Sequence, residues 1–547
     1  MDGLRPVGDC SLEILRSGRE CSAKTPPKSR RVGGLLSDLL VLMGACGLLV
    51  GAGHAEGYPN PASQENERPG TPDWELVNPA LQHEIEGYAD AASAEPGGTI
   101  RLHVSSASPR FSVDVFRMGW YAGAGARRVL EFREMAGGKR AVPKPREGDG
   151  LIECNWPISC RVPIGADWVS GVYLARLTGT GDGKQSFVPF VVREPIRREA
   201  TARRAPILVQ VSVNTWQAYN NWGGKSLYDF NSFGGRAMRV SFDRPYATSA
   251  EAGRGAGAGE FLSVTHASPA AGWEYPFVRW IEKEGYDVAY ATNLDLHADP
   301  SILGKRKALL VVGHDEYWTR LMRDNAERAR DQGVNLGIFA ANVCYWQVRC
   351  EPSSTGVLDR TLFCAKQADK DPVANTERDR DLTVRFRNLH PARPEVALVG
   401  MMMSAEDVQG DFTPLPQARG HWVYANTGIA AGTTHAVRGL LGYEVDRSFA
   451  KDKTFARFSP PRLTVLARAW VQPLKVDRPP TESTIYVAPS GANVFAAGTM
   501  EWSWGLDDWG APELRSARSH PDIARITKNL LARFLGSAPK PGPRSPG

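Results

Sequence analysis

The sequence lacks most of the short motifs that mark common enzyme classes. Ten histidines are scattered over 547 residues, and neither an HExxH helix nor a CxxC pair occurs. A histidine-rich metal site and a zinc ribbon are therefore not expected. There is also no GxSxG elbow, no Walker loop and no GxGxxG after a strand. The sequence thus gives no support to a serine hydrolase, a nucleoside triphosphatase or a dinucleotide-binding enzyme.

A strong excess of one charge sign is missing as well. The chain has 66 Lys and Arg against 60 Asp and Glu, a formal net charge of +6. No basic run is interleaved with aromatic residues, so we expect no nucleic-acid partner. A hydrophobic content of 42% and a charged content of 23% are ordinary for a globular protein. At 547 residues the chain exceeds what one hydrophobic core usually serves, so two or more domains are expected.

The N-terminal region has the features of an export signal. Residues 29–31 (Ser-Arg-Arg) precede the apolar segment VGGLLSDLLVLMGACGLLVGAG, which ends near a small-x-small cleavage site at residues 53–55. Asp38 and several glycines inside the segment argue against a permanent membrane span. The paired arginines resemble a twin-arginine signal, so we expect residues 1–55 to direct export to the periplasm or the outside of the cell. A lipoprotein attached through Cys46 is the alternative, although the residues before it match a lipobox poorly.

Five cysteines remain once the three in the leader are set aside. Cys154 and Cys160 are close in sequence, as are Cys344, Cys350 and Cys364. In an oxidising compartment disulfides are the default for such groups, with one thiol left over and a connectivity that the sequence does not give. Cys344 follows a predicted strand but lacks the glycine-flanked elbow of a nucleophile, so we interpret it as buried or disulfide-bonded.

The predicted fold class is multidomain, β followed by α/β. Residues 56–78 are rich in Pro, Asn and Glu and are predicted to be a flexible linker. Residues 79–195 contain short alternating strands at spacings that suit a β-sandwich. Residues 196–540 alternate apolar strands with amphipathic helices, which predicts a doubly wound, amidotransferase-like α/β domain.

Two loops dense in polar and aromatic residues follow strands of this predicted α/β domain. NTWQAYNNWGG (214–224) follows the apolar run PILVQVSV (206–213), and GHDEYW (313–318) follows ALLVV (308–312). In open α/β sheets, ligands bind beyond the carboxyl ends of the strands. The two loops are therefore expected to converge on one edge of the sheet and to form a binding site there.

Oxygen donors are abundant in and around these loops. They are Glu316 and the tyrosines Tyr219, Tyr228, Tyr246 and Tyr317. Hard anionic oxygens favour hard cations, and ferric iron bound by phenolates is chemically reasonable. A bound cation would bring the pKa of a phenol well below its free value of about 10.

Tryptophan offers a competing interpretation. The chain has fifteen tryptophans, and seven fall in the predicted loops. They could form a platform for stacking on a sugar, the walls of a dry pocket, or plain core. The seven are Trp216, Trp222, Trp318, Trp346, Trp422, Trp502 and Trp504.

Several longer segments together resemble a known family. NTWQAYNNWGGKSLYDF, RVSFDRPY, GHDEYWT, NLGIFAANVCYWQVR, GLLGYEVD and FAAGTMEWSWGLDD are similar, in this order, to the C-terminal region of the N,N-dimethylformamidase large (beta) subunit. GWYAGAGAR and WVSGVYLARL resemble the β-rich domain that precedes that region. The resemblance extends over roughly residues 80–540, nearly all of the chain beyond the leader.

The resemblance implies a mononuclear, non-haem ferric iron site held by two tyrosines and a glutamate. By motif, the glutamate ligand corresponds to Glu316 and a neighbouring histidine to His314. Tyr219 in NTWQAYN is the first tyrosine ligand. Tyr246 in FDRPY is assigned as the second, with Tyr228 kept as the alternative.

The resemblance also implies roles in amide hydrolysis. Iron would act as a Lewis acid, with Glu444 of GYEVD as general base. His314 would stabilise the oxyanion or protonate the leaving amine. Asn214, Trp216 and Asn220 are predicted to contact the substrate, a small amide.

The function predicted from the sequence is therefore an exported amidohydrolase acting on a small amide C–N bond. The alternatives are a carbohydrate-binding or carbohydrate-processing envelope protein and a non-catalytic relative that keeps the fold. The family enzyme pairs its large subunit with a small one, to which nothing in this sequence corresponds. A separate small subunit and a homo-oligomer both stay open.

Overall fold

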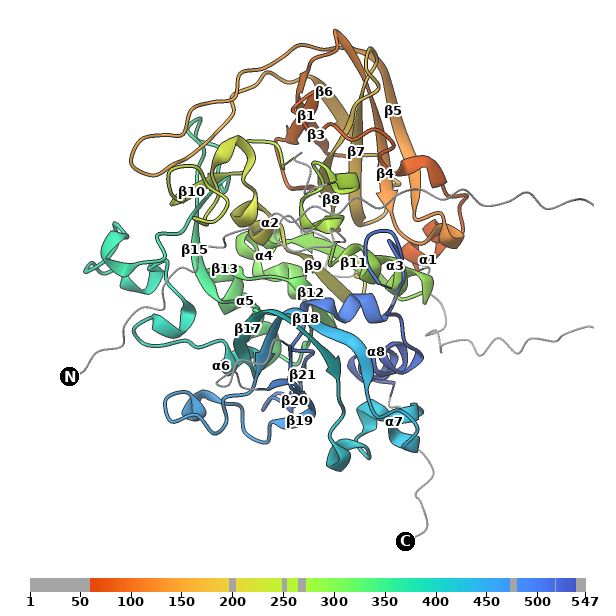
Figure 1. Cartoon of the computed structure of the whole chain (residues 1–547), viewed down its shortest axis with the longest axis vertical. Coiled ribbons are helices and arrows are strands. Elements are labelled where there is room, and N and C mark those ends of the chain that lie inside the picture. Colours follow the sequence, from red (N-terminus) through yellow and green to blue (C-terminus); the bar gives the residue numbers. More distant parts are fainter. Residues whose placement is uncertain are drawn as a thin grey trace, which may run out of the picture. The chain divides into compact units, whose positions relative to one another are not determined.

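The computed structural model describes residues 60–195, 203–247, 253–263, 272–472, 480–516 and 518–537 (Figure 1). Contacts divide the chain after Tyr58, and every described residue belongs to the unit Pro59–Gly547. The predicted export signal, residues 1–55, lies outside the described residues. No helix in the described ranges is long and apolar enough to span a membrane.

From residue 60 onward, the segment predicted to be a flexible linker contains a helix and buried side chains. Helix α1 (Pro61–Asn66) begins at Asn60, whose side chain caps it. Glu65 is buried, and its Oε1 lies 2.6 Å from Nε of Arg127. Trp74 is also buried, with 3% of its surface exposed. The composition of the segment suggested flexibility because composition does not show tertiary contacts. Here Glu65 pairs with Arg127, and Trp74 donates to the carbonyl of Ala124.

The strands expected between residues 79 and 195 form two sheets, drawn in red through orange to yellow in Figure 1. One core cluster draws on both sheets and includes Val104, Val113 and Tyr173. The three-stranded sheet has the order β1 (Ile85–Ala89), β3 (Thr99–Ser106), β6 (Cys160–Pro163). The five-stranded sheet has the order β2 (Ser93–Ala94), β8 (Gln185–Val192), β7 (Gly171–Gly179), β4 (Arg110–Met118), β5 (Ala126–Ala136).

A seven-stranded mixed sheet contains the apolar runs of the second half of the sequence. In the order given below, the first five strands pair in parallel. The sixth strand pairs antiparallel with both the fifth and the seventh. Every residue of its strands β9, β12 and β14 is buried, as expected for strands covered on both faces. Their order is β11 (Val288–Thr292), β9 (Ile207–Val211), β12 (Ala308–His314), β14 (Asn335–Ala341), β21 (Asn493–Ala496), β20 (Thr481–Val487), β19 (Thr464–Ala469).

Helices are few, and the longest were visible in the sequence. Helix α5 (Arg320–Asp331) starts where Thr319 Oγ1 accepts a hydrogen bond from the backbone N–H of Met322, and Gly333 follows it with a φ of +94°. The residues predicted as the loop 214–224 begin instead as a short helix. The remaining helices are α2 (Val213–Tyr219), α3 (Tyr275–Lys283), α4 (Asn293–Ala298), α6 (Val396–Val399), α7 (Gly428–Ala431) and α8 (Pro521–Phe534).

Two smaller sheets complete the β structure and were not predicted. One has the order β10 (Arg239–Ser241), β16 (Thr361–Phe363), β15 (Trp346–Glu351), β13 (Tyr317–Thr319). The other pairs β17 (Met402–Phe412) with β18 (Val437–Arg447) over a long antiparallel ladder with register shifts. The described chain is thus β-rich, with mixed sheets and few helices, and these two sheets carry residues of the site described below.

All five cysteines of the described residues are free thiols, so the disulfide prediction is wrong. Cys344 lies with its Sγ 3.7 Å from Nη1 of Arg323. Cys350 pairs with Leu362 in the ladder between β15 and β16. Closeness in sequence did not bring the thiols together, because each is buried or part-buried at its own place in the fold.

Candidate metal centre

The GHDEYW segment crosses from β12 to β13, and a glycine sets its path. Gly313 has a φ of +72°, a conformation that other residues rarely adopt. A Cβ at this position would lie 2.2 Å from the Cβ of Trp273. Close packing and backbone conformation both require glycine here, and together they direct His314 and Glu316 toward the same site.

Replacing Gly313 by alanine should therefore destabilise the fold. Positive φ in a non-glycine residue costs about 1–3 kcal/mol, and overpacking a core adds about 1–3 kcal/mol. Chemical denaturation should show a loss of roughly 2–6 kcal/mol in the free energy of unfolding. Gly138→Ala is the control, since no atom lies within 4 Å of a Cβ there. Equal stability of the two variants would contradict this account of the turn.

The carboxylate of Glu316 accepts hydrogen bonds from two phenols. Tyr219 Oη and Tyr228 Oη each lie 2.8 Å from Glu316 Oε2, and Tyr228 Oη lies 3.0 Å from Oε1. The two tyrosine rings stack with centroids 4.4 Å apart. Tyr219 ends helix α2, just past the carboxyl end of β9, which neighbours β12. The expected convergence of the two loops therefore occurs at Glu316.

Tyr246, the tyrosine assigned as the second ligand, lies elsewhere. Its ring packs edge-on against Trp216, with centroids 6.1 Å apart, and among the described residues no hydrogen bond joins it to Glu316. Buried Arg244 explains this placement, because it donates to the side chain of Gln217 and holds the backbone before Tyr246 against α2. The geometry favours the alternative, Tyr228, as the neighbour of Glu316.

His314 lies among three carboxylates. Its Nδ1 is 3.2 Å from Glu260 Oε2, and its Nε2 is 3.5 Å from Glu316 Oε2 and 3.9 Å from Glu444 Oε2. Burial by itself lowers the pKa of His314, but the carboxylates outweigh it, with Glu260 contributing most, and the pKa is raised well above its ordinary value. The imidazole is thus held charged in this arrangement and can donate a hydrogen bond or a proton.

Glu444 approaches the same place from strand β18. Its side chain is buried, and Oε2 has no hydrogen-bond partner among the described residues. Burial raises the pKa of Glu444 to about 8; the charge of His314 opposes the shift and that of Glu316 adds to it. A buried carboxyl with an unused oxygen and a raised pKa is suited to accepting a proton.

The ionisation of the Glu316 site follows from burial and its neighbours. Burial, followed by the charge of Glu316, raises the pKa values of Tyr219 and Tyr228 well above that of a free phenol. Burial would raise the pKa of Glu316 too, but His314 and then Lys366 lower it by more, so it lies below its ordinary value. Without a cation, the site therefore consists of one carboxylate that accepts hydrogen bonds from two neutral phenols.

The predicted substrate-binding residues are buried and engaged in structural hydrogen bonds. Asn214 Nδ2 donates to the carbonyl of Tyr317 at 3.2 Å. Trp216 Nε1 donates to Glu274 Oε1 at 2.8 Å, and Asn220 Nδ2 donates to the carbonyl of Pro245 at 2.9 Å. These contacts support the walls of the site.

A small cavity lies next to Glu260. Trp216, Asn220, Tyr246 and Glu260 are among the residues that line it. It connects three of the sequence-predicted residues to the carboxylate that contacts His314 Nδ1.

The sequence did not reveal Lys366 as part of the site. Its Nζ lies 3.4 Å from the ring centroid of Tyr228 and 5.6 Å from that of Tyr317. Burial lowers the pKa of Lys366 to about 8, while the nearby Glu316 opposes the shift. A single lysine in a loop carries no motif, so no signal in the sequence marked it. It adds a second positive group beside the carboxylate.

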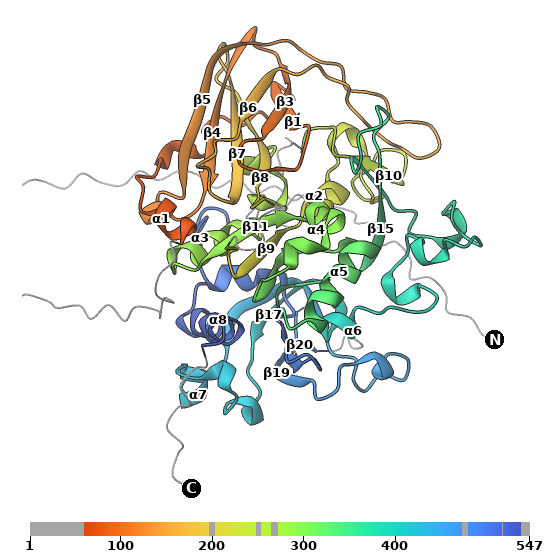
Figure 2. The same ribbon diagram turned by 180° about the vertical axis from the view of Figure 1, so that it is seen from behind.

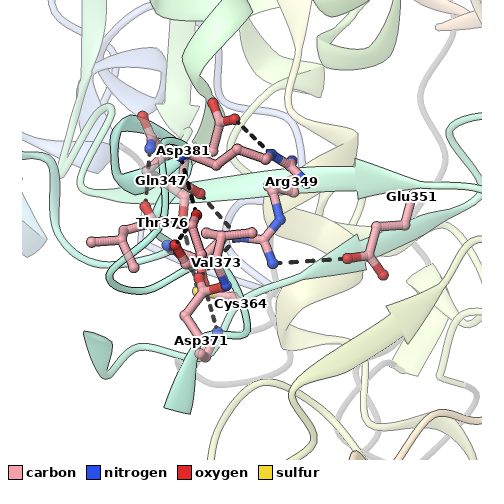
Figure 3. A network of polar contacts seen from close by, with 12 residues as sticks. Gln347, Arg349, Glu351, Cys364, Asp371, Val373, Thr376 and Asp381 are labelled. Atoms are coloured by element: carbon pink, nitrogen blue, oxygen red, sulfur yellow. Dashed lines mark hydrogen bonds and ion pairs between the residues drawn. The ribbon is translucent and has the colours of Figure 1, made fainter. Parts of the chain in front are cut away.

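A polar network fastens the loop that carries Lys366 (Figure 3). Arg349 on β15 donates to Asp371 Oδ2 at 2.9 Å. The same oxygen accepts from both the backbone N–H and the hydroxyl of Thr383, at 2.8 and 2.6 Å. The carbonyl of Thr383 in turn accepts from the N–H of Lys366. Strand β15 thereby fixes the position of the lysine.

The donor set fits a hard cation. Two phenol oxygens converge on one carboxylate oxygen, so displacing the two phenol protons would place three hard oxygens around one ion. The unused oxygen of buried Glu444 also faces this group across His314. Tyr219, Tyr228 and Glu316 are therefore the residues that could hold ferric iron, and their role as ligands stays a prediction.

The structure thus presents a β-rich protein with a buried oxygen-donor centre at the end of a parallel strand pair. Residues 112–517 match the family model described as N,N-dimethylformamidase beta subunit-like, C-terminal. The chain belongs to this family, as the sequence motifs predicted.

Two curated relatives are similar to this chain. The N,N-dimethylformamidase beta subunits of Alcaligenes sp and Paracoccus aminophilus are each 23% identical to it, over 461 and 463 residues. Each match covers 72% of this chain and 56% of the relative, so the chain spans about half the length of the curated relatives it matches. A solved structure of the sulfur carrier protein SoxY from Chlorobium limicola f thiosulfatophilum matches with a TM-score of 0.13 and 14% identity, over 22% of this chain and 84% of that one.

Proposed function

We propose that this protein is an iron-dependent amidohydrolase that cleaves the C–N bond of a small amide. The observation that carries the proposal is the convergence of Tyr219 and Tyr228 on Glu316, with His314 and Glu444 beside them. Membership of the dimethylformamidase-like family supports a hydrolase. Dimethylformamide itself is named only for the relatives, so the substrate proposed for this chain is the wider class of small amides.

Tyr219, Tyr228 and Glu316 would hold the metal through their oxygen atoms. Lewis-acid activation of the amide carbonyl is the chemistry that iron supplies when bound. Lys366 lies over the ring of Tyr228 and would favour its anionic form, since a nearby positive charge stabilises a phenolate.

Glu444 and His314 would move the protons. Glu444 would take a proton from the attacking water at its unused oxygen, Oε2. His314 would donate from Nε2, first as a hydrogen bond to the developing oxyanion and then as a proton to the leaving amine. Glu260, 3.2 Å from Nδ1, orients the imidazole for this task.

The proposal extends to the architecture and the location of the protein. The two sheets of residues 85–192 would form a β-sandwich, and the seven-stranded sheet with its helices an amidotransferase-like, doubly wound domain. Residues 1–55 would export the protein to the periplasm or the exterior. Because the relatives are named as beta subunits, a separate subunit is proposed as a partner.

The tryptophans give little support to a carbohydrate platform. Six of the seven are buried, with at most 9% of their surface exposed, and Trp422 is half-buried. An indole without an exposed face cannot stack on a sugar ring. Burial therefore favours the amidohydrolase over a sugar-binding function.

The direct test is amide hydrolysis by the purified, iron-loaded chain. Formamides and acetamides with small N-substituents are incubated with the protein, and release of the amine is measured. We expect turnover that is abolished by removing iron with a chelator and restored by adding it back. Iron-loaded protein without turnover on any of these amides, or turnover that is equal in the iron-free protein, would overturn the proposal.

A further inference from the structure

A second group of metal-ligating side chains lies outside the site described above. His297, Cys350 and Asp359 each offer one ligand atom, and these atoms all lie within 4.8 Å of one another. Nε2 of His297 is 3.8 Å from Oδ1 of Asp359. None of these three residues belongs to the Glu316 site.

The three residues come from three separate elements. His297 is on helix α4, Cys350 is on strand β15, and Asp359 lies in the turn that leads into β16. Helix α4 and β15 are visible in both ribbon views (Figures 1 and 2). The backbone of Asp359 has a φ of +57°, which fixes the turn in a defined conformation. The ligand atoms are therefore carried by ordered elements distant in sequence.

The histidine has a partner that leaves one nitrogen available. Nδ1 of His297 is 2.7 Å from the hydroxyl oxygen of Thr319, the residue that caps helix α5. Metal-binding histidines usually use their other ring nitrogen in a contact of this kind, which orients the ring. This contact points Nε2 toward the aspartate.

We propose that His297, Cys350 and Asp359 form a second metal site for a zinc-like divalent ion. Sulfur, imidazole nitrogen and carboxylate oxygen are the ligand types of zinc. Tetrahedral bonds of about 2.0–2.3 Å put two ligand atoms roughly 3.3–3.8 Å apart, so the His297–Asp359 pair already has nearly the needed spacing.

The exposure of the cluster leaves the fourth position to water. The side chains of His297 and Asp359 are 17% and 35% exposed. An ion there would tie α4 to strand β15 and to the turn that leads into β16. This inference does not rest on the proposed amidohydrolase function.

The test uses cobalt as a spectroscopic substitute for zinc. The full chain is freed of metal and titrated with Co²⁺, and the thiolate-to-cobalt absorption is recorded. We expect one equivalent of Co²⁺ to produce this absorption, and one equivalent of Zn²⁺ to remove it by displacement. Running the titration also in the Glu316→Ala background separates this site from the proposed iron site, since the absorption is expected to be unchanged.

Two variants and a control make the outcome decisive. Cys350→Ser should lose the thiolate absorption. Asp359→Asn keeps a residue type that tolerates the left-handed backbone conformation. It should weaken Zn²⁺ binding by more than about 10–100-fold, which is the usual loss when a residue that only hydrogen-bonds a metal ligand is replaced. Cys160→Ser, a change at a buried cysteine outside the cluster, should leave the absorption intact. A wild-type protein without the absorption, or a Cys350→Ser protein that keeps it, would overturn the proposal.

Discussion

The Glu316→Ala protein is expected to fold, to bind no iron and to lose amide hydrolysis. Glu316 accepts both phenol hydrogen bonds of the site, so its removal leaves Tyr219 and Tyr228 without their common acceptor. Lewis-acid activation contributes several kcal/mol to the transition state, which corresponds to a rate loss of about 10³-fold or more. Iron content by elemental analysis and amine release are the two measurements.

Glu327→Ala is the matched control for this variant. Glu327 is a salt-bridged glutamate on α5, paired with Arg323 and Arg393, and has no contact with the site. Far-ultraviolet circular dichroism checks that both variants fold. If Glu316→Ala kept a full complement of iron while Glu327→Ala behaved in the same way, Glu316 could not be a ligand.

The Glu444→Gln protein is expected to keep its iron and to lose most of its activity. Glutamine preserves the size of the side chain but cannot accept the proton, and general-base catalysis is worth about 10²–10⁴-fold. Burial raises the pKa of Glu444 to about 8, so the wild-type base becomes available as the pH rises. The rise of rate with pH should therefore be present in the wild type and absent in the variant.

Glu501→Gln provides the comparison for this second variant. Glu501 is similarly buried and its pKa is raised to about 7 by burial, but its hydrogen bonds go to Gln409 and Arg518. It should retain both its activity and its pH dependence. A Glu444→Gln protein as active as Glu501→Gln would exclude Glu444 as the base.

Much of the frame of the site could be predicted from local sequence patterns. The apolar runs 207–211 and 308–314 form neighbouring parallel strands because a continuous run of buried residues fits a sheet covered on both faces. Their carboxyl ends then meet by topology alone. This is why Tyr219, His314 and Glu316 were expected together and are found together.

The choice between the tyrosines could not be made from the sequence. Tyr228 and Tyr246 both lie in the loops that follow α2. From sequence distance alone, either could reach Glu316. Contacts far beyond the local pattern separate them: Arg244 donates to Gln217 and to backbone carbonyls, which directs Tyr246 away. The position of this buried arginine depends on tertiary packing, which hydrophobic periodicity and sequence motifs do not show.

Lys366 and the free thiols were missed for related reasons. Lys366 reaches the site only because a network between β15 and the following loop holds its backbone in place. The thiols are free and lie at separate places in the fold, although their spacing in the sequence suggested pairs. In both cases the decisive contacts join residues whose relation depends on the complete fold.

The central claim, that two phenols and Glu316 form an iron site, is tested most directly by visible absorption of the iron-loaded protein. Phenolate bound to ferric iron gives a charge-transfer band, so the wild type should be coloured. Tyr228→Phe should lose or shift this band and Tyr246→Phe should keep it, because Tyr228 hydrogen-bonds Glu316 whereas Tyr246 packs against Trp216. An iron-loaded wild type without the band, or a Tyr228→Phe protein with an unaltered one, would contradict the account.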